Sequence, residues 1–309
     1  MISKKCLVVF IGSFFYAYAS FANHKTFRFD TLIVYQLLSL DTASKVAVKK
    51  ELNTYNENQQ LIEKKVMIYD QKKDLWLPQK RFVLQYFKSE IMVNCFNNES
   101  SNQEIQFGRY ILLLDEHQHI IECTKLDKDR YADKYYRRSK YELTYKNDTL
   151  RSKIFFNEGT IFYKNEETIF DYSKNLVFIH EKIFEESGVE KSASDKEVSF
   201  SNQQIKSIQY YNEKKVCLYK DTFYYKKDTL IHMDAFKYSG GNEKIKTLSH
   251  RIFYKVLKGQ IESATLLYYN KAQQPVADAR NYYIKYSTST KNLQQILGIL
   301  QYDIDYFLK

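Results

Sequence analysis

The sequence predicts a mostly-β protein: an extended antiparallel sheet or an array of β-hairpins, followed by an amphipathic helix at the C-terminus. Three observations lead to this fold class. Tyr is unusually frequent, with 28 residues in a chain of 309, and aromatic residues favour strands. Apolar and polar side chains alternate along many segments, and short polar phrases separate those segments. Near residue 286 a period of three to four residues replaces the alternation.

Residues 1–22 have the layout of a secretory signal peptide. Lys4 and Lys5 precede an apolar run, and Ser20 and Ala22 place small residues at the −3 and −1 positions of a cleavage site. The run is shorter than the ~20 residues that span a bilayer. We therefore expect cleavage after Ala22 and a mature chain that is exported, to the periplasm or the cell surface.

Residues 23–286 are expected to form the antiparallel sheet. Phe82, Leu84 and Tyr86 fall on one side of an extended chain, and residues 141–145 and 282–286 repeat this alternation. Such a pattern is typical of antiparallel strands with one buried and one wet face.

A short phrase recurs between the alternating segments: an aromatic residue, a polar run and then an aliphatic residue. Each copy predicts a strand end, a polar turn and a strand start. Asn and Asp suit such turns because they tolerate the left-handed backbone conformation. The copies span residues 55–61, 69–75, 145–150, 163–169, 172–176, 211–216, 225–230 and 269–276, with 114–120 as a variant that has Leu in the aromatic slot.

These phrases resemble degenerate YD-type (Rhs-like) repeats, whose core is Tyr-Asp-x-x-Gly-x-Leu; Tyr69, Asp70 and Leu75 occupy the matching places of one copy. The stretch 76–86, which begins with Trp76, is similar to the Trp-containing strand of related secreted repeat proteins. The resemblance implies chained β-hairpins in a secreted or surface bacterial protein. A sheet without repeat ancestry predicts the same phrases, since the repeat Gly is absent from each copy.

The segment 185–197 interrupts the strand pattern with small and polar residues. It is expected to be a long exposed loop, or a boundary that subdivides the β region.

The tail, residues 287–309, is expected to be an amphipathic helix with Ser289 or Thr290 as its N-cap. It would close the end of the sheet or, as the alternative, bind a partner. Its apolar positions are Leu293, Ile296, Leu297, Leu300, Ile304 and Phe307.

Three cysteines follow the predicted cleavage site: Cys95, Cys123 and Cys217. An odd number cannot pair completely within one chain. A bridge between Cys95 and Cys123 and buried unpaired thiols are both open.

No catalytic or cofactor motif occurs in the sequence, so we expect no cofactor. His117 and His119 are the best metal candidates, because alternate strand residues share a face. They lie in a polar turn phrase, however, and a zinc site needs at least three protein ligands. A metal site is therefore not the favoured interpretation.

The candidate ligand-binding residues are Tyr135, Tyr136, Arg137 and Arg138, within a basic and aromatic stretch. A solvated strand face is one interpretation. The other is recognition of an envelope polymer, a glycan, a protein or a membrane surface, through sugar stacking on Tyr and the positive charge. The net charge of +10 becomes +8 when Lys4 and Lys5 leave with the signal. Export argues against nucleic acid as the partner.

The expected function is that of an exported, non-enzymatic binding or structural protein of the bacterial cell envelope or surface. The alternative is a secreted hydrolase acting on glycan or peptide, with a site assembled from distant residues. An outer-membrane barrel is a third option, but Lys is frequent on both faces of the expected strands, which argues against a lipid-facing band.

Overall fold

The computed structural model describes residues 30–287 except 59, 99–103, 130, 133, 148, 159–161, 203, 227–228, 240–241, 258–259 and 279. The predicted signal peptide, residues 1–22, lies outside the described residues, and so does the predicted helix apart from Ser287, which ends the last strand. No helix that is long and apolar enough to cross a membrane occurs in the described part of the chain.

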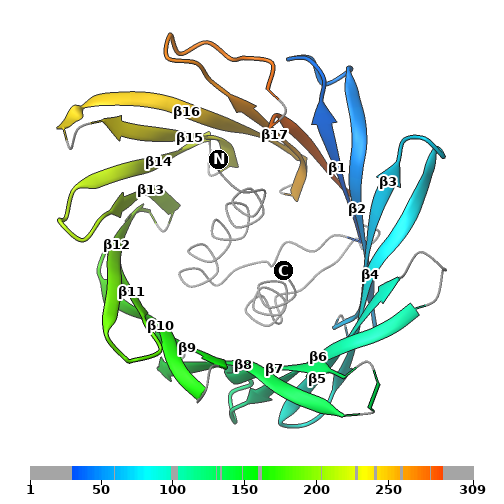
Figure 1. Ribbon diagram of the computed structural model, residues 1–309. Coiled ribbons are helices and arrows are strands. Elements are labelled where there is room, and N and C mark those ends of the chain that lie inside the picture. The colour runs from blue at the N-terminus through cyan, green and yellow to red at the C-terminus, as the bar shows by residue number, and fades with distance from the viewer. Residues whose placement is uncertain are drawn as a thin grey trace.

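The described chain folds into strands throughout, with short connections between them (Figure 1). The strands are β1 (Thr31–Leu37), β2 (Lys45–Tyr55), β3 (Leu61–Asp70), β4 (Leu75–Tyr86), β5 (Glu90–Asn98), β6 (Glu104–Leu114), β7 (Ile120–Lys128), β8 (Tyr135–Lys146), β9 (Thr149–Glu158), β10 (Phe162–Ser173), β11 (Leu176–Phe184), β12 (Glu190–Ser201), β13 (Gln204–Tyr211), β14 (Cys217–Lys226), β15 (Thr229–Ser239), β16 (Asn242–Leu257), β17 (Gln260–Tyr268) and β18 (Tyr282–Ser287).

The sheet closes on itself as an 18-stranded antiparallel barrel. Each strand pairs with the next one, and β1 also pairs with β18, from Thr31 opposite Ser287 to Gln36 opposite Tyr282. The prediction of a mostly-β antiparallel protein is confirmed, but the extended, open form was wrong. Closure removes both unpaired sheet edges. It depends on contacts between the two ends of the described chain, which no local pattern reveals.

Most of the polar phrases connect strands as predicted. Residues 55–61, 114–120, 145–150 and 225–230, for example, join consecutive strands. Residues of several turns have positive φ, among them Asp74, Asn147 and Lys215. The phrase 163–169 is the exception, because it lies inside β10. The strand already pairs with β9 before this phrase, with Phe162 opposite Glu158, and a bulge between Lys164 and Glu166 absorbs the irregular polar run into the sheet.

The segment 185–197 is a strand for most of its length, so the expected long loop was wrong there. Only residues 185–189 form the turn, and β12 pairs with β11 along its length. Ion pairs replace apolar packing at this place: Lys182 Nζ lies 2.9 Å from Glu190 Oε2, and Lys196 Nζ lies 2.6 Å from Glu181 Oε1. A search for apolar alternation therefore overlooks this strand.

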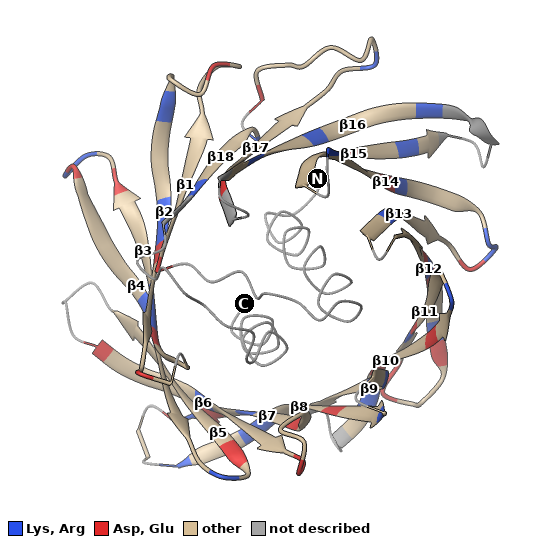
Figure 2. Ribbon diagram, turned by 180° about the vertical axis from the view of Figure 1, so that it is seen from behind, with Lys and Arg blue, Asp and Glu red and all other residues tan. Residues whose placement is uncertain are grey.

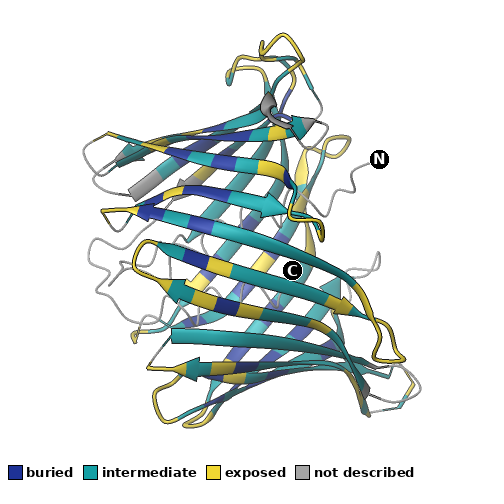
Figure 3. Cartoon of the chain, turned by 90° about the vertical axis from the view of Figure 1, so that its left-hand side faces the viewer, coloured by how far each residue is buried: buried dark blue, intermediate teal, exposed yellow. Residues whose placement is uncertain are grey.

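The wall is a single layer, and its buried apolar residues lie on one face. Cross-strand partners share a face, and Leu84–Val93 and Leu112–Cys123 are such partners among the buried residues. Buried positions recur along the strands of the wall, as Figure 3 shows. Crowding of this kind arises on the concave side, so we call it the inner face. The residue offset between paired strands gives the same assignment. The common twist of β-sheets tilts the strands of every barrel in the same sense, so the direction of this offset fixes which side of each strand faces inward. The opposite side is the outer face.

Apolar pairs surround one end of the barrel, at the turns that follow β2, β4, β6, β8, β10, β12 and β14. Two tyrosines of these pairs connect strands through hydrogen bonds: Tyr86 Oη donates to Leu61 O at 2.9 Å, and Tyr172 Oη donates to Leu150 O at 2.8 Å. We call these pairs the hairpin ring: Tyr55–Leu61, Tyr86–Ile91, Leu114–Ile120, Tyr145–Leu150, Tyr172–Val177, Phe200–Ile205 and Tyr225–Leu230.

Candidate functional site

The predicted ligand-binding residues at the start of β8 are divided between the two faces. Tyr135 packs on the outer face against Arg109, whose guanidinium lies 4.7 Å from the ring centroid. Tyr136 is exposed on the inner face, where it pairs with Asp127. Arg138 lies at a bulge, with its Nε 3.2 Å from Asp127 Oδ2. Arg137 is opposite Leu126. The four side chains therefore do not form one continuous surface.

His117 and His119 occupy the turn between β6 and β7. His119 stacks on Tyr145 with ring centroids 4.6 Å apart, and its Nδ1 lies 3.1 Å from Asp115 Oδ2. His117 is near Glu116, at 3.6 Å. Burial raises the pKa of Asp115, but hydrogen bonds from His119 and His117 outweigh it and lower that pKa. No group of three metal-ligating side chains forms within the described residues.

Cys95, Cys123 and Cys217 are buried cysteines that are not joined by a disulfide. Cys95 is opposite Phe82 and Gly108, whereas Cys123 is opposite Leu112 and Tyr141. The suggested bridge between Cys95 and Cys123 is thus not formed. Burial raises the pKa of Cys95 to about 12, so this thiol stays protonated and unreactive at neutral pH.

The inner face carries a buried ionic group at β2 and β3. Glu51 lies between two lysines, with its carboxylate 2.5 Å from Lys49 Nζ and 3.3 Å from Lys64 Nζ. Burial alone would raise the pKa of Glu51. The charges of Lys64 and Lys49, which also hydrogen-bond to it, lower the pKa to about 2. This inner charge cluster is a structural part of the wall, because the Glu51 carboxylate offsets one of the two lysine charges and holds both ammonium groups.

A second buried acid of the inner face lies on β14. Asp221 accepts a hydrogen bond from Tyr210 Oη at 3.0 Å, and its cross-strand neighbours Ile208 and Ala235 are apolar. Burial raises the pKa of Asp221 to about 7, against the smaller lowering effect of the Tyr210 hydrogen bond. Near neutral pH this carboxyl group therefore binds and releases a proton.

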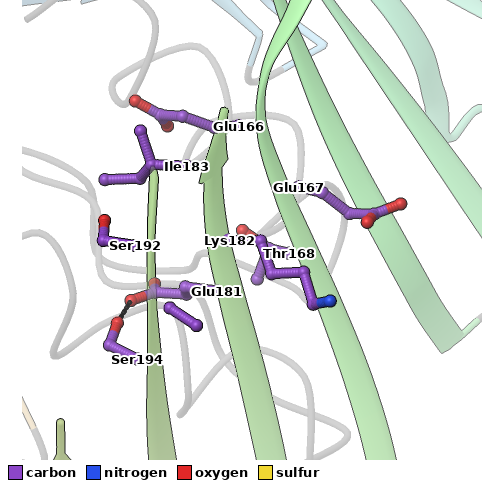
Figure 4. A pocket seen from close by; sticks show the side chains of 9 residues that line it. Glu166, Glu167, Thr168, Glu181, Lys182, Ile183, Ser192 and Ser194 are labelled. Atoms are coloured by element: carbon purple, nitrogen blue, oxygen red, sulfur yellow. Dashed lines mark hydrogen bonds between the residues drawn. The ribbon is translucent and has the colours of Figure 1, made fainter. Parts of the chain in front are cut away.

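One small pocket lies between β10, β11 and β12, with a volume of about 130 Å³. Glu166 and Glu167 lie on opposite sides of β10, as Figure 4 shows. The Glu181 carboxylate of the pocket accepts hydrogen bonds from Ser194 Oγ at 3.3 Å and from Lys196 Nζ at 2.6 Å. Sites for small molecules usually enclose about 300–1,000 Å³. This pocket is smaller, and its Glu181 is already paired.

Ion pairs connect neighbouring strands on the outer face. Glu63 is 2.6 Å from Arg81 Nε and 2.9 Å from Lys65 Nζ. Asp234 accepts two hydrogen bonds from Arg251. Charged residues of both signs occur on strands around the whole barrel, as Figure 2 shows. Asp234 and Arg251 lie near the middle of β15 and β16, so the outer face carries charge at the level where a membrane barrel would contact lipid tails.

Aromatic residues that the sequence analysis did not single out form a line on the same outer face, across β14, β15, β16, β18 and β1. Each one is an ordinary strand residue in the sequence, and only the cross-strand register places them side by side. We call this line the outer aromatic row: Tyr224, His232, Phe253, Tyr283 and Tyr35.

No protein-family model matches the chain, and no curated protein matches it. Among solved structures it is similar to a porin-like protein from Bacteroides uniformis ATCC 8492, with a TM-score of 0.45 and 10% identity, over 85% of this chain and 98% of that one. It is also similar to a porin-like protein from Bacteroides vulgatus ATCC 8482, with a TM-score of 0.38 and 9% identity, over 86% and 99%. A protein of unknown function from Bacteroides fragilis NCTC 9343 matches at a TM-score of 0.34 and 12% identity, over 38% and 91%.

Proposed function

We propose that the chain is an exported, non-enzymatic binding or structural protein of the cell envelope, and that its barrel stands in water instead of crossing a bilayer. The observation that carries this proposal is the distribution of charge on the outer face. Glu63 with Arg81 and Asp234 with Arg251 pair in the outer wall, and His180 Nδ1 lies 2.7 Å from Asp195 Oδ1 in the same face.

The two faces are the reverse of those in a membrane barrel. A membrane barrel has an apolar band outside and a polar interior, and Arg or Lys at the bilayer midplane costs about 2–4 kcal/mol each. Here the clustered apolar residues face inward, as Ile91 and Met233 do, and the outer face carries the ion pairs. An ion pair that water reaches, such as Arg81 with Glu63, carries no such cost.

The binding interpretation is favoured over the hydrolase. A hydrolase acting on a glycan would need two carboxylates flanking a space that holds a sugar ring. The pocket that contains Glu166 and Glu181 is small, and Lys196 already pairs with Glu181. The outer wall, in contrast, presents a broad surface of aromatic and charged groups, which suits recognition of a large ligand.

Fractionation of the native host with a tagged copy tests this proposal. We expect recovery after osmotic shock without detergent, or digestion by added protease in intact cells if the protein is on the surface. Mobility on a gel should not change between heated and unheated samples. Extraction only by detergent together with heat-modifiable mobility would contradict an aqueous barrel, and recovery in the cytoplasm would contradict export.

A further inference from the structure

The outer aromatic row is continuous in the register of the sheet. Tyr224 is opposite His232, and His232 is opposite Phe253. Phe253 is opposite Thr265, which is opposite Tyr283. Tyr283 is opposite Tyr35, which ends the row. The row crosses six neighbouring strands, and five spacings of about 4.8 Å give it a length of about 24 Å.

The rings of the row contact one another in two groups, which Thr265 separates, and none of the five rings is buried. Tyr224 and His232 are stacked, with centroids 4.2 Å apart, and His232 is 6.2 Å from Phe253. Tyr224 is 37% exposed and Phe253 is 39% exposed. Burial lowers the pKa of His232, although Asp234 raises it, so the imidazole is neutral at pH 7 and stacks as an aromatic ring.

Cations flank the row. Lys45 Nζ lies 4.2 Å from the Tyr283 centroid and 5.0 Å from that of Tyr35. The Arg251 guanidinium is 5.7 Å from the Phe253 centroid. Lys226 and Lys285 are exposed beside the row. The nearby acids are already paired, Asp234 with Arg251 and Glu262 with Lys255. Because Asp234 neutralises Arg251, the positive charge around the rings comes from Lys45, Lys226 and Lys285.

We propose that the outer aromatic row binds an extended acidic polysaccharide, a ligand class that rests on and sharpens the proposed function. Pyranose rings have an apolar C–H side, which packs on open aromatic faces such as those of Tyr224 and Phe253. Their carboxylates pair with the flanking cations, Lys45 among them. The length of the row suits a chain of several sugars that bends with the wall. A lipid bilayer suits it less, because the row is narrow and lies on a convex wall.

Binding of polygalacturonate oligomers to the purified mature protein, measured by calorimetry, tests the proposal. We expect saturable binding that weakens as salt rises. Phe253→Ala and Tyr224→Ala should each weaken it about fivefold or more, because each removes one stacking surface. Lys45→Gln should weaken binding and reduce its salt dependence.

Phe178→Ala is the matched control, because Phe178 is an outer-face aromatic that is 37% exposed on β11, away from the row. Its affinity for polygalacturonate should equal that of the wild type. Equal affinity for neutral dextran, stronger binding to phosphatidylglycerol vesicles, or no effect of Phe253→Ala and Tyr224→Ala would each overturn the proposal. These binding results do not bear on the localisation. If the protein is exported and released without detergent but does not bind polygalacturonate, only the ligand class is disproved. If it is recovered in the cytoplasm or embedded in a membrane, the proposed function is disproved.

Discussion

The inner and outer faces of the barrel wall are built by different physics, although every strand contributes to both. The inner face packs two clusters of buried aliphatic and aromatic residues, and it encloses its few charges. The outer face leaves its rings half open and covers the wall with ion pairs. We therefore expect stability to depend mainly on the inner face, which leaves the outer face available for recognition.

The largest expected difference concerns a single carboxylate on each face. Glu51→Gln leaves the ammonium groups of Lys49 and Lys64 without their buried counter-charge, and should lower the free energy of unfolding by about 3–5 kcal/mol. Glu63→Gln, on the outer face, should cost about 1 kcal/mol or less. Urea unfolding of both variants measures these losses of stability. Equal losses would contradict the expectation that the inner face contributes more to stability.

The same carboxylate makes a prediction about acid. The pKa of Glu51 falls from 4.5 to about 2 on folding. The folded state therefore gains stability that is fully present above pH 4.5 and is lost as pH falls toward 2. The difference in stability between wild type and Glu51→Gln should shrink over this range.

Apolar burial gives the next contrast. Ile91 is 0% exposed on the inner face, and Ile91→Ala should cost about 2–5 kcal/mol because it leaves a cavity. Ile169 is 36% exposed on the outer face, and Ile169→Ala should cost less than about 1 kcal/mol. Thermal and urea unfolding would show this. A loss of stability in Ile169→Ala as large as that in Ile91→Ala would mean that the side chain of Ile169 is shielded from water on the outer face.

Asp221 should make stability depend on pH near neutrality. Its pKa is raised from 3.8 to about 7 in the folded state, so folding retains a proton that the unfolded chain releases. Stability should fall as pH rises from about 4 to 7, by up to about 4 kcal/mol at 1.36 kcal/mol per pKa unit. Asp221→Asn should remove this slope and be more stable than the wild type at pH 8. An unchanged slope would assign it to other groups.

The smallest expected effect is in the hairpin ring. Tyr172→Phe keeps the aromatic side chain in place but removes the hydrogen bond to Leu150 O, and should lower the free energy of unfolding by about 0.5–1.5 kcal/mol. Tyr224→Phe, on the outer face, is the matched change and should cost less, because the hydroxyl group of an exposed Tyr remains close to water. The melting temperatures of the two variants provide the measurement.

Local patterns predicted the strands and most of the turns, because both depend on neighbours in the chain. The phrase 145–150 is a turn for that reason, with Asn147 at positive φ. The same logic failed for 163–169, where the turn had already occurred, and for 190–197, where ion pairs replace apolar alternation. It also treated residues 135–138 as one patch, although neighbouring residues of a strand point to opposite faces.

Two unlike strand faces and the positions of most turns follow from the amino-acid order, since alternation and turn chemistry act over a few residues. The closure of the sheet, the face that lies inside and the outer residues that lie side by side all depend on how distant strands pair. Closure pairs Thr31 with Ser287 across the length of the described chain. The outer aromatic row exists because the register brings Tyr224, Phe253 and Tyr35 into line. Such register depends on the pairing of distant strands, and no short window of sequence contains it.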